Sequence, residues 1–325
     1  MTSKLSDPHF HTEEAAYQYV EDRLWPEGPL CPHCGSVNNA RSIKPNPKKR
    51  IRYGLKCCND CYDQFTVKVG TIFEDSKVPM HVWLQAMFLL CSSKKGMSTR
   101  QLQRMLGVTL KTAWFMSHRI REAMKDEAGM PIGGLGKTLE VDETFLGQQA
   151  TVFVNGKGWQ QRRGTGDMQK VVSLVERGGR ARSIHVGSLK KDEVIRALQT
   201  ADRDSILNTD QAQHYRRLGK EFAGHAHIDH GREEYGRYDD GVLVTTNTVE
   251  GFFSIFKRGM RGIYQHCGHQ HLHRYLSEFD FRYNNRVALG VDDLARTDNC
   301  LRGAVGKRLT YRRTRGEEQQ WEARA

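Results

Sequence analysis

The chain lacks any long hydrophobic run. Only 38% of its 325 residues are hydrophobic, and no stretch approaches the ~18 consecutive apolar residues that a membrane-spanning helix requires. The first 25 residues are polar and contain no apolar segment of the kind that a secretory signal peptide carries. Internal repeats and low-complexity runs are also missing. These absences predict a cytoplasmic protein of two or three domains that has no membrane partner.

Acidic residues are too few to balance the basic ones. Fifty Lys and Arg stand against 38 Asp and Glu, which leaves a formal net charge of +12 at pH 7. The excess is spread along the chain, and this pattern favours a long polyanionic partner such as DNA. A merely basic soluble protein would have the same balance, so the partner class depends on the motifs.

Five of the eight cysteines crowd into residues 31–61. Two pairs have CxxC spacing: Cys31 with Cys34, and Cys58 with Cys61. Four thiolates in this arrangement are typical of a structural Zn²⁺ site, and the spacing selects Cys58 and leaves Cys57 outside it. Metal-free cysteines and a redox pair are the alternatives, but no βαβ pattern surrounds either pair.

Residues 1–80 are therefore predicted to form an N-terminal helix and a zinc ribbon. Residues 51–55 and 64–69 have the composition and alternation of short strands. A ribbon of this size has no core of its own, so we expect metal binding to supply much of its folding energy.

Residues 81–137 are predicted to be a helical region and a glycine-rich linker. An apolar helix at 81–90 precedes Ser98, which stands three residues before Gln101, a capping-box spacing. Gly107 follows as a turn, and Thr109 can cap a further helix at 110–125. This layout is that of a helix-turn-helix, whose second helix enters the major groove. An ordinary helical hairpin is the alternative. The outward residues expected to contact DNA are Lys111, Thr112, His118, Arg119 and Arg121.

Three carboxylates mark residues 138–290. Asp142 lies in a predicted strand at 138–146, and Asp210 follows a strand at 205–209. Glu250 lies in a predicted helix, with Lys257 two turns or roughly 10 Å further on. Strands at 170–175 and 182–186 and a helix at 192–201 come between the first two acids. The order predicts an α/β domain with the mixed sheet of an RNase H-like fold.

Such an acidic cluster can hold two Mg²⁺ or Mn²⁺ ions, which prefer hard oxygen ligands. A pair of ions can bind both the attacking and the leaving oxygen of an in-line phosphoryl transfer. Each acid also has a structural alternative. Asp142 can be a solvated strand residue, Asp210 a helix N-cap, and Glu250 the partner of Asn247 in a capping box.

At this point the chain resembles a known family, the bacterial insertion-sequence transposases that carry a zinc ribbon and a DDE domain of the ISXO2-like type, relatives of the Merlin elements. The matching strings lie between about residues 14 and 290. They are CPHCGS, CNDCYDQFTVKVGTIFEDSKVP, LEVDETFLG, NTDQAQHY, NTVEGFFSIFKRGMRGIY and YLSEFDFRYNNR.

The resemblance implies DNA cleavage at terminal inverted repeats, followed by strand transfer into target DNA. It assigns the first two metal ligands to Asp142 and Asp210. The family varies between Glu and Asn at the third position, and this chain offers both Glu250 and Asn247. We favour Glu250, which keeps the seven-residue step to Lys257. Family members often carry a His just before this helix, but here the stretch is Val244-Thr245-Thr246.

The sequence thus predicts a DDE transposase that acts on double-stranded DNA, both at transposon ends and at the target. Arg258 and Arg261 are further expected DNA contacts, and residues 291–325 are expected to be a basic tail. Synapsis of two ends implies at least a dimer, associated with the bacterial nucleoid. The alternatives are an RNase H-like nuclease or resolvase, which needs no sequence-reading front end, and a zinc-ribbon regulator, which needs no acidic cluster.

Overall fold

The computed structural model describes residues 3–126, 129–149, 151–161, 164–211, 213–232, 234–239 and 241–310. The chain forms two compact units. The first unit comprises Met1–Lys125 and Asp292–Ala325, and the second comprises Asp126–Val291. No helix in the described part of the chain is long and apolar enough to cross a membrane.

The first unit contains a small antiparallel ribbon. Its three strands have the order β1-β2-β3. They are β1 (Ala40–Ser42), β2 (Lys56–Cys58) and β3 (Gln64–Phe65). The strand predicted at 51–55 was misplaced, since Ile51 makes only an isolated bridge to Asn46. The strand predicted at 64–69 ends early because the chain turns, with the Val69 amide donating to the Thr66 carbonyl at 3.1 Å.

Helices make up the rest of the first unit. They are α1 (Glu13–Leu24), α2 (Met80–Ser92), α3 (Thr99–Leu106), α4 (Leu110–Ala123) and α9 (Asp293–Arg302), with short 3₁₀ turns at Lys4–Ser6, Pro8–Phe10 and Pro47–Lys49. The apolar α2 buries Trp83 and Leu84 and packs against each of the other four helices. Ser98 and Thr109 cap α3 and α4 as predicted, and Gly107 between them has a left-handed backbone.

The segment predicted as a basic tail contains a helix instead. Asp292 caps α9 by accepting from the Ala295 amide at 2.8 Å. Arg296, 7% exposed, donates to the Cys91 carbonyl of α2 at 3.0 Å. These contacts make α9 part of the first unit's core. Residues 311–325, the end of the predicted tail, lie outside the described residues.

The second unit is built on a five-stranded sheet in the order β10-β9-β4-β7-β8. The strands are β4 (Thr138–Leu146), β7 (Gln169–Glu176), β8 (Ala181–Val186), β9 (Ile206–Asp210) and β10 (Gly224–Ile228). The pairs β4–β7 and β7–β8 are antiparallel, whereas β4–β9 and β9–β10 are parallel. This is the mixed sheet of an RNase H-like fold, as predicted. The edge strand β10 was missed because its alternating residues include small Gly224 and Ala226, which give only a weak apolar signal.

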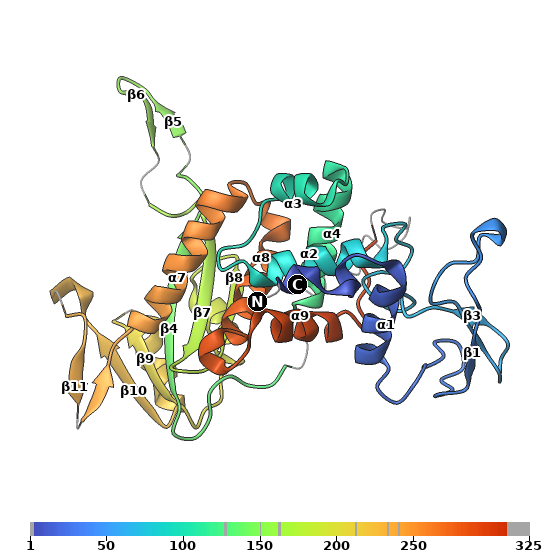
Figure 1. The fold of residues 1–325 in the computed structure, drawn as a ribbon. Coiled ribbons are helices and arrows are strands. Elements are labelled where there is room, and N and C mark those ends of the chain that lie inside the picture. Colours follow the sequence, from blue (N-terminus) through green and yellow to red (C-terminus); the bar gives the residue numbers. More distant parts are fainter. Residues whose placement is uncertain are drawn as a thin grey trace. The chain divides into compact units, whose positions relative to one another are not determined.

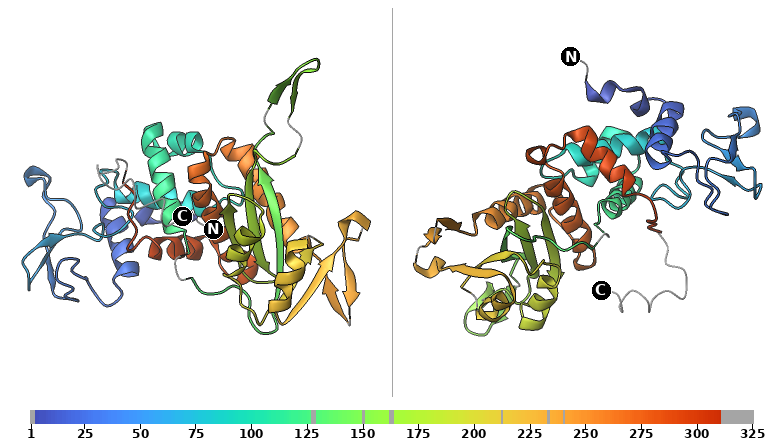
Figure 2. Two further views of the ribbon diagram at one scale, coloured as in Figure 1. Left: turned by 180° about the vertical axis from the view of Figure 1, so that it is seen from behind. Right: turned by 90° about the horizontal axis from the view of Figure 1, so that it is seen from below.

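Helices cover both faces of the sheet (Figure 1). The helices α5 (Lys191–Leu198) and α6 (Gln213–Leu218) pack on one face, around buried Leu139, Val141 and Leu207. On the other face lie α7 (Asn247–Gly259), its π-helical continuation Met260–Tyr264, and α8 (Leu272–Asn284). Figure 2 shows the same unit from behind and from below. Short 3₁₀ turns lie at Gly219–Glu221, His230–Arg232, His269–His271 and Val287–Leu289.

An ion pair in α8 is buried rather than on the surface, where the i, i+4 spacing suggested it. Arg282 pairs with Glu278, and the two side chains are 6% and 0% exposed. The Tyr264 hydroxyl also donates to Glu278. The helix turns this pair inward because Tyr275 and Phe279 on the same side pack against α7.

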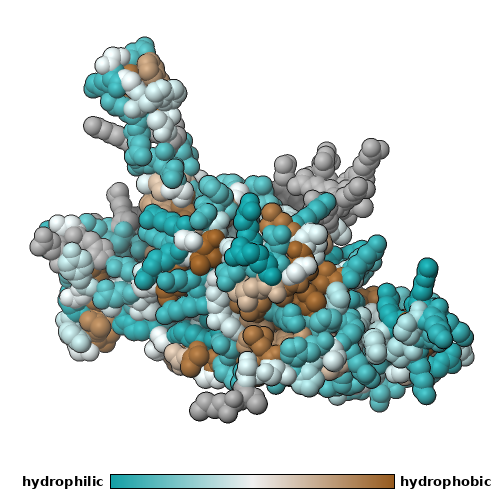
Figure 3. Space-filling view, turned by 45° about the horizontal axis from the view of Figure 1, so that its top comes forward, coloured by the Kyte–Doolittle hydropathy of each residue, from teal (hydrophilic) through white to brown (hydrophobic). Residues whose placement is uncertain are grey.

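Two hairpins extend from the second unit, as Figure 1 shows. They are β5 (Thr151–Val154) with β6 (Gly158–Gln161), and β11 (Arg237–Asp239) with β12 (Val242–Val244). On the first hairpin Phe153 pairs across the strands with Trp159, and their ring centroids are 5.6 Å apart. These rings are 60% and 72% exposed, and apolar surface is visible toward the tip of the projection in Figure 3.

Candidate acidic site and zinc centre

The sheet register brings the first two predicted metal ligands together. The parallel pairing of β4 with β9 matches Val141 with Thr209, so the next step of the register sets Asp142 beside Asp210. Neighbouring strands lie ~4.8 Å apart, and alternate residues share a face. Since Val141 and Leu207 belong to the core under α5 and α6, Asp142 and Asp210 belong to the opposite face, which α7 covers.

A third carboxylate joins these two, and it is one that the sequence did not single out. Oxygen atoms of Asp142, Glu143 and Asp210 all lie within 4.8 Å of one another. Glu143 comes from the next position of β4, and the hydroxyl of buried Tyr215 in α6 donates to it at 2.6 Å. Its adjacency to Asp142 was visible in the sequence. Its contact with Tyr215, 72 residues further along the chain, could not be predicted from local sequence.

Burial and like charge act together on Asp142. The pKa of Asp142 is raised to about 7, mainly by burial and also by the carboxylates of Glu143, Asp210 and Glu250, while a hydrogen bond from the Glu143 amide acts to lower it. Half-buried carboxylates that repel one another are stabilised by a cation. Hard oxygen donors of this kind suit Mg²⁺ or Mn²⁺, so the residues fit the metal that the sequence predicts.

Glu250 lies in the first turn of α7, close enough to act electrostatically on Asp142 but outside the cluster of three carboxylates. Its side chain is exposed and accepts a hydrogen bond from the Thr246 hydroxyl at 2.9 Å. Its negative charge raises the pKa of Asp142. The capping box suggested by the Asn247 spacing was wrong, because the helix has Thr246 at its N-cap and Asn247 as its first residue. The Asn247 side chain is exposed, and the geometry leaves both residues as candidates for the third ligand.

The basic residues predicted beyond Glu250 lie on α7 and its continuation. Lys257 is half-buried, with its ammonium 6.0 Å from the Phe253 ring. Arg258 is exposed and donates to the Ser254 carbonyl at 3.0 Å. Arg261 is exposed in the π-helical turn. Both arginines are therefore accessible to a polyanion.

The helix-turn-helix residues divide into two groups. Lys111 is exposed and Thr112 half-buried, near the start of α4. In contrast, His118, Arg119 and Arg121 are 0%, 4% and 1% exposed, so their prediction as DNA contacts was wrong. Arg119 donates to the carbonyls of Ile72, Glu74 and Leu309 at 2.6, 2.7 and 3.0 Å.

These three side chains are buried because other segments of the first unit pack around α4. Arg121 donates to the Ser117 hydroxyl at 3.1 Å, and the His118 ring packs against Trp114. The exposed cations of the helix pair are instead Arg100 and Arg104 on α3 and Lys111 on α4. The outward side of α4 was predicted from helical spacing alone. Spacing does not reveal how many sides of a helix are covered by other segments.

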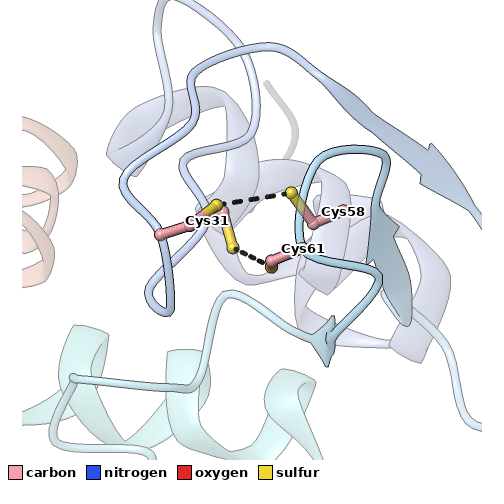
Figure 4. Close-up of side chains that lie close together, drawn as sticks. Cys31, Cys58 and Cys61 are labelled. Atoms are coloured by element: carbon pink, nitrogen blue, oxygen red, sulfur yellow. Dashed lines mark hydrogen bonds between the residues drawn. The ribbon is translucent and has the colours of Figure 1, made fainter.

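The four predicted zinc ligands form one cluster, with their sulfurs within 4.8 Å of one another. The sulfur of Cys31 is 3.7 Å from that of Cys61, and that of Cys34 is 3.6 Å from that of Cys58 (Figure 4). A tetrahedral Zn²⁺ with bonds of about 2.3 Å would separate its sulfurs by roughly 3.8 Å. The cysteines therefore already stand at the spacing that zinc requires.

Backbone amides support the thiolate form. Amides of Cys61 and Asp60 donate to Cys58 and lower its pKa to about 7, against the effect of burial. Cys57 is outside the cluster, and its thiol donates to the Tyr62 carbonyl at 3.4 Å. Cys58, which the CxxC spacing predicts as a ligand, thus lies in the cluster, whereas Cys57 does not.

Comparison with known proteins agrees with both sites. Residues 11–64 match the transposase zinc-ribbon domain, and residues 134–284 match the ISXO2-like transposase domain. The two matched domains are those of the zinc-ribbon insertion-sequence transposases, the family that the chain resembles. The first match includes the four cysteines, and the second runs from the start of β4 to the end of α8.

Two individual proteins are similar to the chain. An uncharacterized protein in transposable element ISH50 of Halobacterium salinarum is 28% identical over 267 residues, which cover 77% of this chain and 83% of the relative. Among solved structures, a chain from the simian T-cell lymphotropic virus intasome in complex with PP2A regulatory subunit B56 gamma has 15% identity and a TM-score of 0.28. That match covers 55% of this chain and 63% of the viral-complex chain.

Proposed function

We propose that this transposase binds the inverted-repeat ends of its element and carries out Mg²⁺-dependent DNA strand cleavage and strand transfer. The observation that carries the proposal is the meeting of Asp142 and Asp210 on one face of the β4–β9 pair, under α7. Glu250 is the third ligand in this proposal because it adds negative charge from a separate element.

When bound, two divalent ions would supply Lewis-acid stabilisation of the oxygens on either side of the reacting phosphorus. The protein's own part is to place the carboxylates. Asp142 and Asp210 are set by the sheet register, and Glu250 is set by the position of α7. Tyr215 holds the Glu143 carboxylate next to them. Lys257, two turns along α7, provides a positive charge for a DNA phosphate.

Apart from half-buried Lys257, the proposed DNA contacts are exposed cations. Arg100, Arg104 and Lys111 of α3 and α4 suit a helix-turn-helix that lies against duplex DNA, while Arg258 and Arg261 suit phosphates near the acidic site. The β5–β6 hairpin adds Lys157 in its turn and the exposed aromatic pair of Phe153 and Trp159. Exposed aromatic rings with basic neighbours are suited to stacking on unpaired bases at a DNA end.

The partners are accordingly double-stranded DNA, as transposon ends and as target, and a second copy of the chain. Joining two ends to one target requires that both ends be held together, which implies at least a dimer. We place this activity at the bacterial nucleoid, where such DNA is found.

The test incubates the full chain with labelled transposon-end DNA, a target plasmid and Mg²⁺. Joined end-plus-target product is expected from the wild type and should disappear in Asp210→Asn. Glu193→Gln, an acid on α5 away from the site, is the matched control and should remain active. Cleavage without joining would favour a nuclease, and sequence-specific binding without any strand chemistry would point to a regulator.

A further inference from the structure

A buried polar layer lies directly beneath the acidic site. Glu140 on β4 is 0% exposed and Asn208 on β9 is 1% exposed, and the sheet register pairs them with each other. Both precede a predicted metal ligand by two residues, so each shares a face with Asp142 or Asp210. A carboxylate is costly to bury unless it is paired and fully hydrogen-bonded, so the partners of Glu140 indicate what it does.

Those partners are the start of α7 and one arginine. One Glu140 oxygen accepts from the backbone amides of Thr248 and Val249 at 2.7 and 3.1 Å. The other accepts from the Thr248 hydroxyl at 2.8 Å and from Arg177 at 2.8 and 3.1 Å. All of these donors converge on a single side chain.

Among the described residues, the local side-chain cap of the helix is a single bond, in which the Thr245 hydroxyl accepts from the Asn247 amide at 3.2 Å. The residue at its N-cap, Thr246, makes no side-chain hydrogen bond to the helix amides. A local cap would fix α7 only to its own loop, whereas Glu140 fixes it to the strand that carries Asp142. Its negative charge also lies at the helix N-terminus, where the helix dipole favours it.

Asn208 and Arg177 also attach the segment before α7 to the sheet. The Asn208 side-chain amide donates to the Thr245 carbonyl at 3.4 Å, and Arg177 donates to the Leu243 carbonyl at 2.8 Å. The segment that leads into α7 is thereby attached to β9 and to the end of β7 as well as to β4. Glu250 follows Val249 directly, so its backbone position is determined by these attachments.

We propose that Glu140 is a positioning residue that fixes the start of α7 on β4 and so sets Glu250 opposite Asp142 and Asp210. This inference rests on the proposed function, since it explains how the third ligand of that site is placed. Glu140 itself does not touch DNA or metal in this account. It acts through the amides of Thr248 and Val249 and through the Thr248 hydroxyl.

The test compares two double variants of the full chain that carry the same net charge. In Glu140→Gln with Arg177→Met, the glutamine oxygen can still accept from the two amides. In Glu140→Ala with Arg177→Met, no acceptor remains. Any difference between the two therefore comes from removal of the side chain that accepts from α7 and not from lost charge.

The readouts are Mn²⁺ affinity, DNA-end joining, and hydrogen exchange of the Thr248 and Val249 amides. The glutamine variant should stay near wild type in all three. The alanine variant should exchange both amides faster and lose about 10- to 100-fold in Mn²⁺ affinity or joining rate, the range for residues that orient metal ligands. Unchanged Mn²⁺ affinity and joining in the alanine variant would overturn the proposal.

Two further outcomes keep the test decisive. If the alanine variant fails to fold, as judged by exchange of β7 amides, Thr248→Val replaces it. That variant removes only the hydroxyl donor and should shift Mn²⁺ affinity in the same direction by less, whereas no shift would count against the proposal. If the wild type neither binds Mn²⁺ nor joins DNA, the proposed function fails, and the inference fails with it.

Discussion

Replacing Cys34 by Ser removes one thiolate from the zinc cluster and leaves the other three cysteines in place. The ribbon has little else to hold it, because its core consists of Cys31, Cys58 and Phe65 with a few half-buried neighbours. Burying one Phe contributes roughly 1.5–3 kcal/mol, whereas a structural zinc site contributes roughly 10–16 kcal/mol. An equal share per thiolate is about 2.5–4 kcal/mol, or roughly two to three orders of magnitude in zinc affinity.

The assay follows zinc content and trypsin cleavage in the basic segment between the two CxxC pairs, which includes Lys48, Lys49 and Arg50. We expect Cys34→Ser to lose zinc to a chelator that the wild type resists, and to be cut rapidly in this segment. Cys57→Ser, outside the cluster, should behave as the wild type. A zinc-free protein that resists trypsin as well as the zinc-bound form would refute the reasoning.

Three further predictions concern the second unit. Arg282→Met should lower the free energy of unfolding by about 3–5 kcal/mol, because it leaves Glu278 charged and buried, and adding Glu278→Gln should restore most of it in chemical denaturation. Phe153→Ala with Trp159→Ala should weaken binding to DNA ends in a fluorescence titration without changing the melting temperature, since both rings are exposed; unchanged affinity would exclude the hairpin. Burial, followed by the charges of nearby basic groups, lowers the pKa of His185 to about 4. The unfolded chain therefore binds the extra proton first, and stability should fall as the pH drops from about 6.5 toward 4, an effect that His185→Gln should reduce.

Much of the catalytic unit was predictable because its elements carry clear local signals. The strand containing Asp142, the strand ending at Asp210 and the helix containing Glu250 all appear close to their predicted positions. The zinc ligands were equally clear, because CxxC spacing reflects the geometry of a short turn around a metal. In both cases the determining information lies within a few residues of sequence.

What escaped prediction depends on contacts between distant segments. Glu140 appears in the sequence as one more acid in a strand, and only the fold reveals that it binds amides 108 and 109 residues away. Arg119 was expected on a DNA-facing surface, but it donates hydrogen bonds to the backbone carbonyls of Leu309 and Ile72. The strand β10 was missed because Gly224 and Ala226 give a weak apolar signal, and its pairing with β9 is evident only in the fold.

The central claim is that Asp142 and Asp210 hold the metal ions that promote strand transfer, and one measurement tests it directly. Asp210→Cys exchanges a hard oxygen ligand for a softer sulfur, which binds Mg²⁺ poorly but accepts Mn²⁺ or Cd²⁺ better. In the end-joining assay we expect this variant to be inactive with Mg²⁺ and partly restored by Mn²⁺ or Cd²⁺, while the wild type works with Mg²⁺. Full activity of the variant with Mg²⁺, or no restoration by either softer ion, would contradict the account.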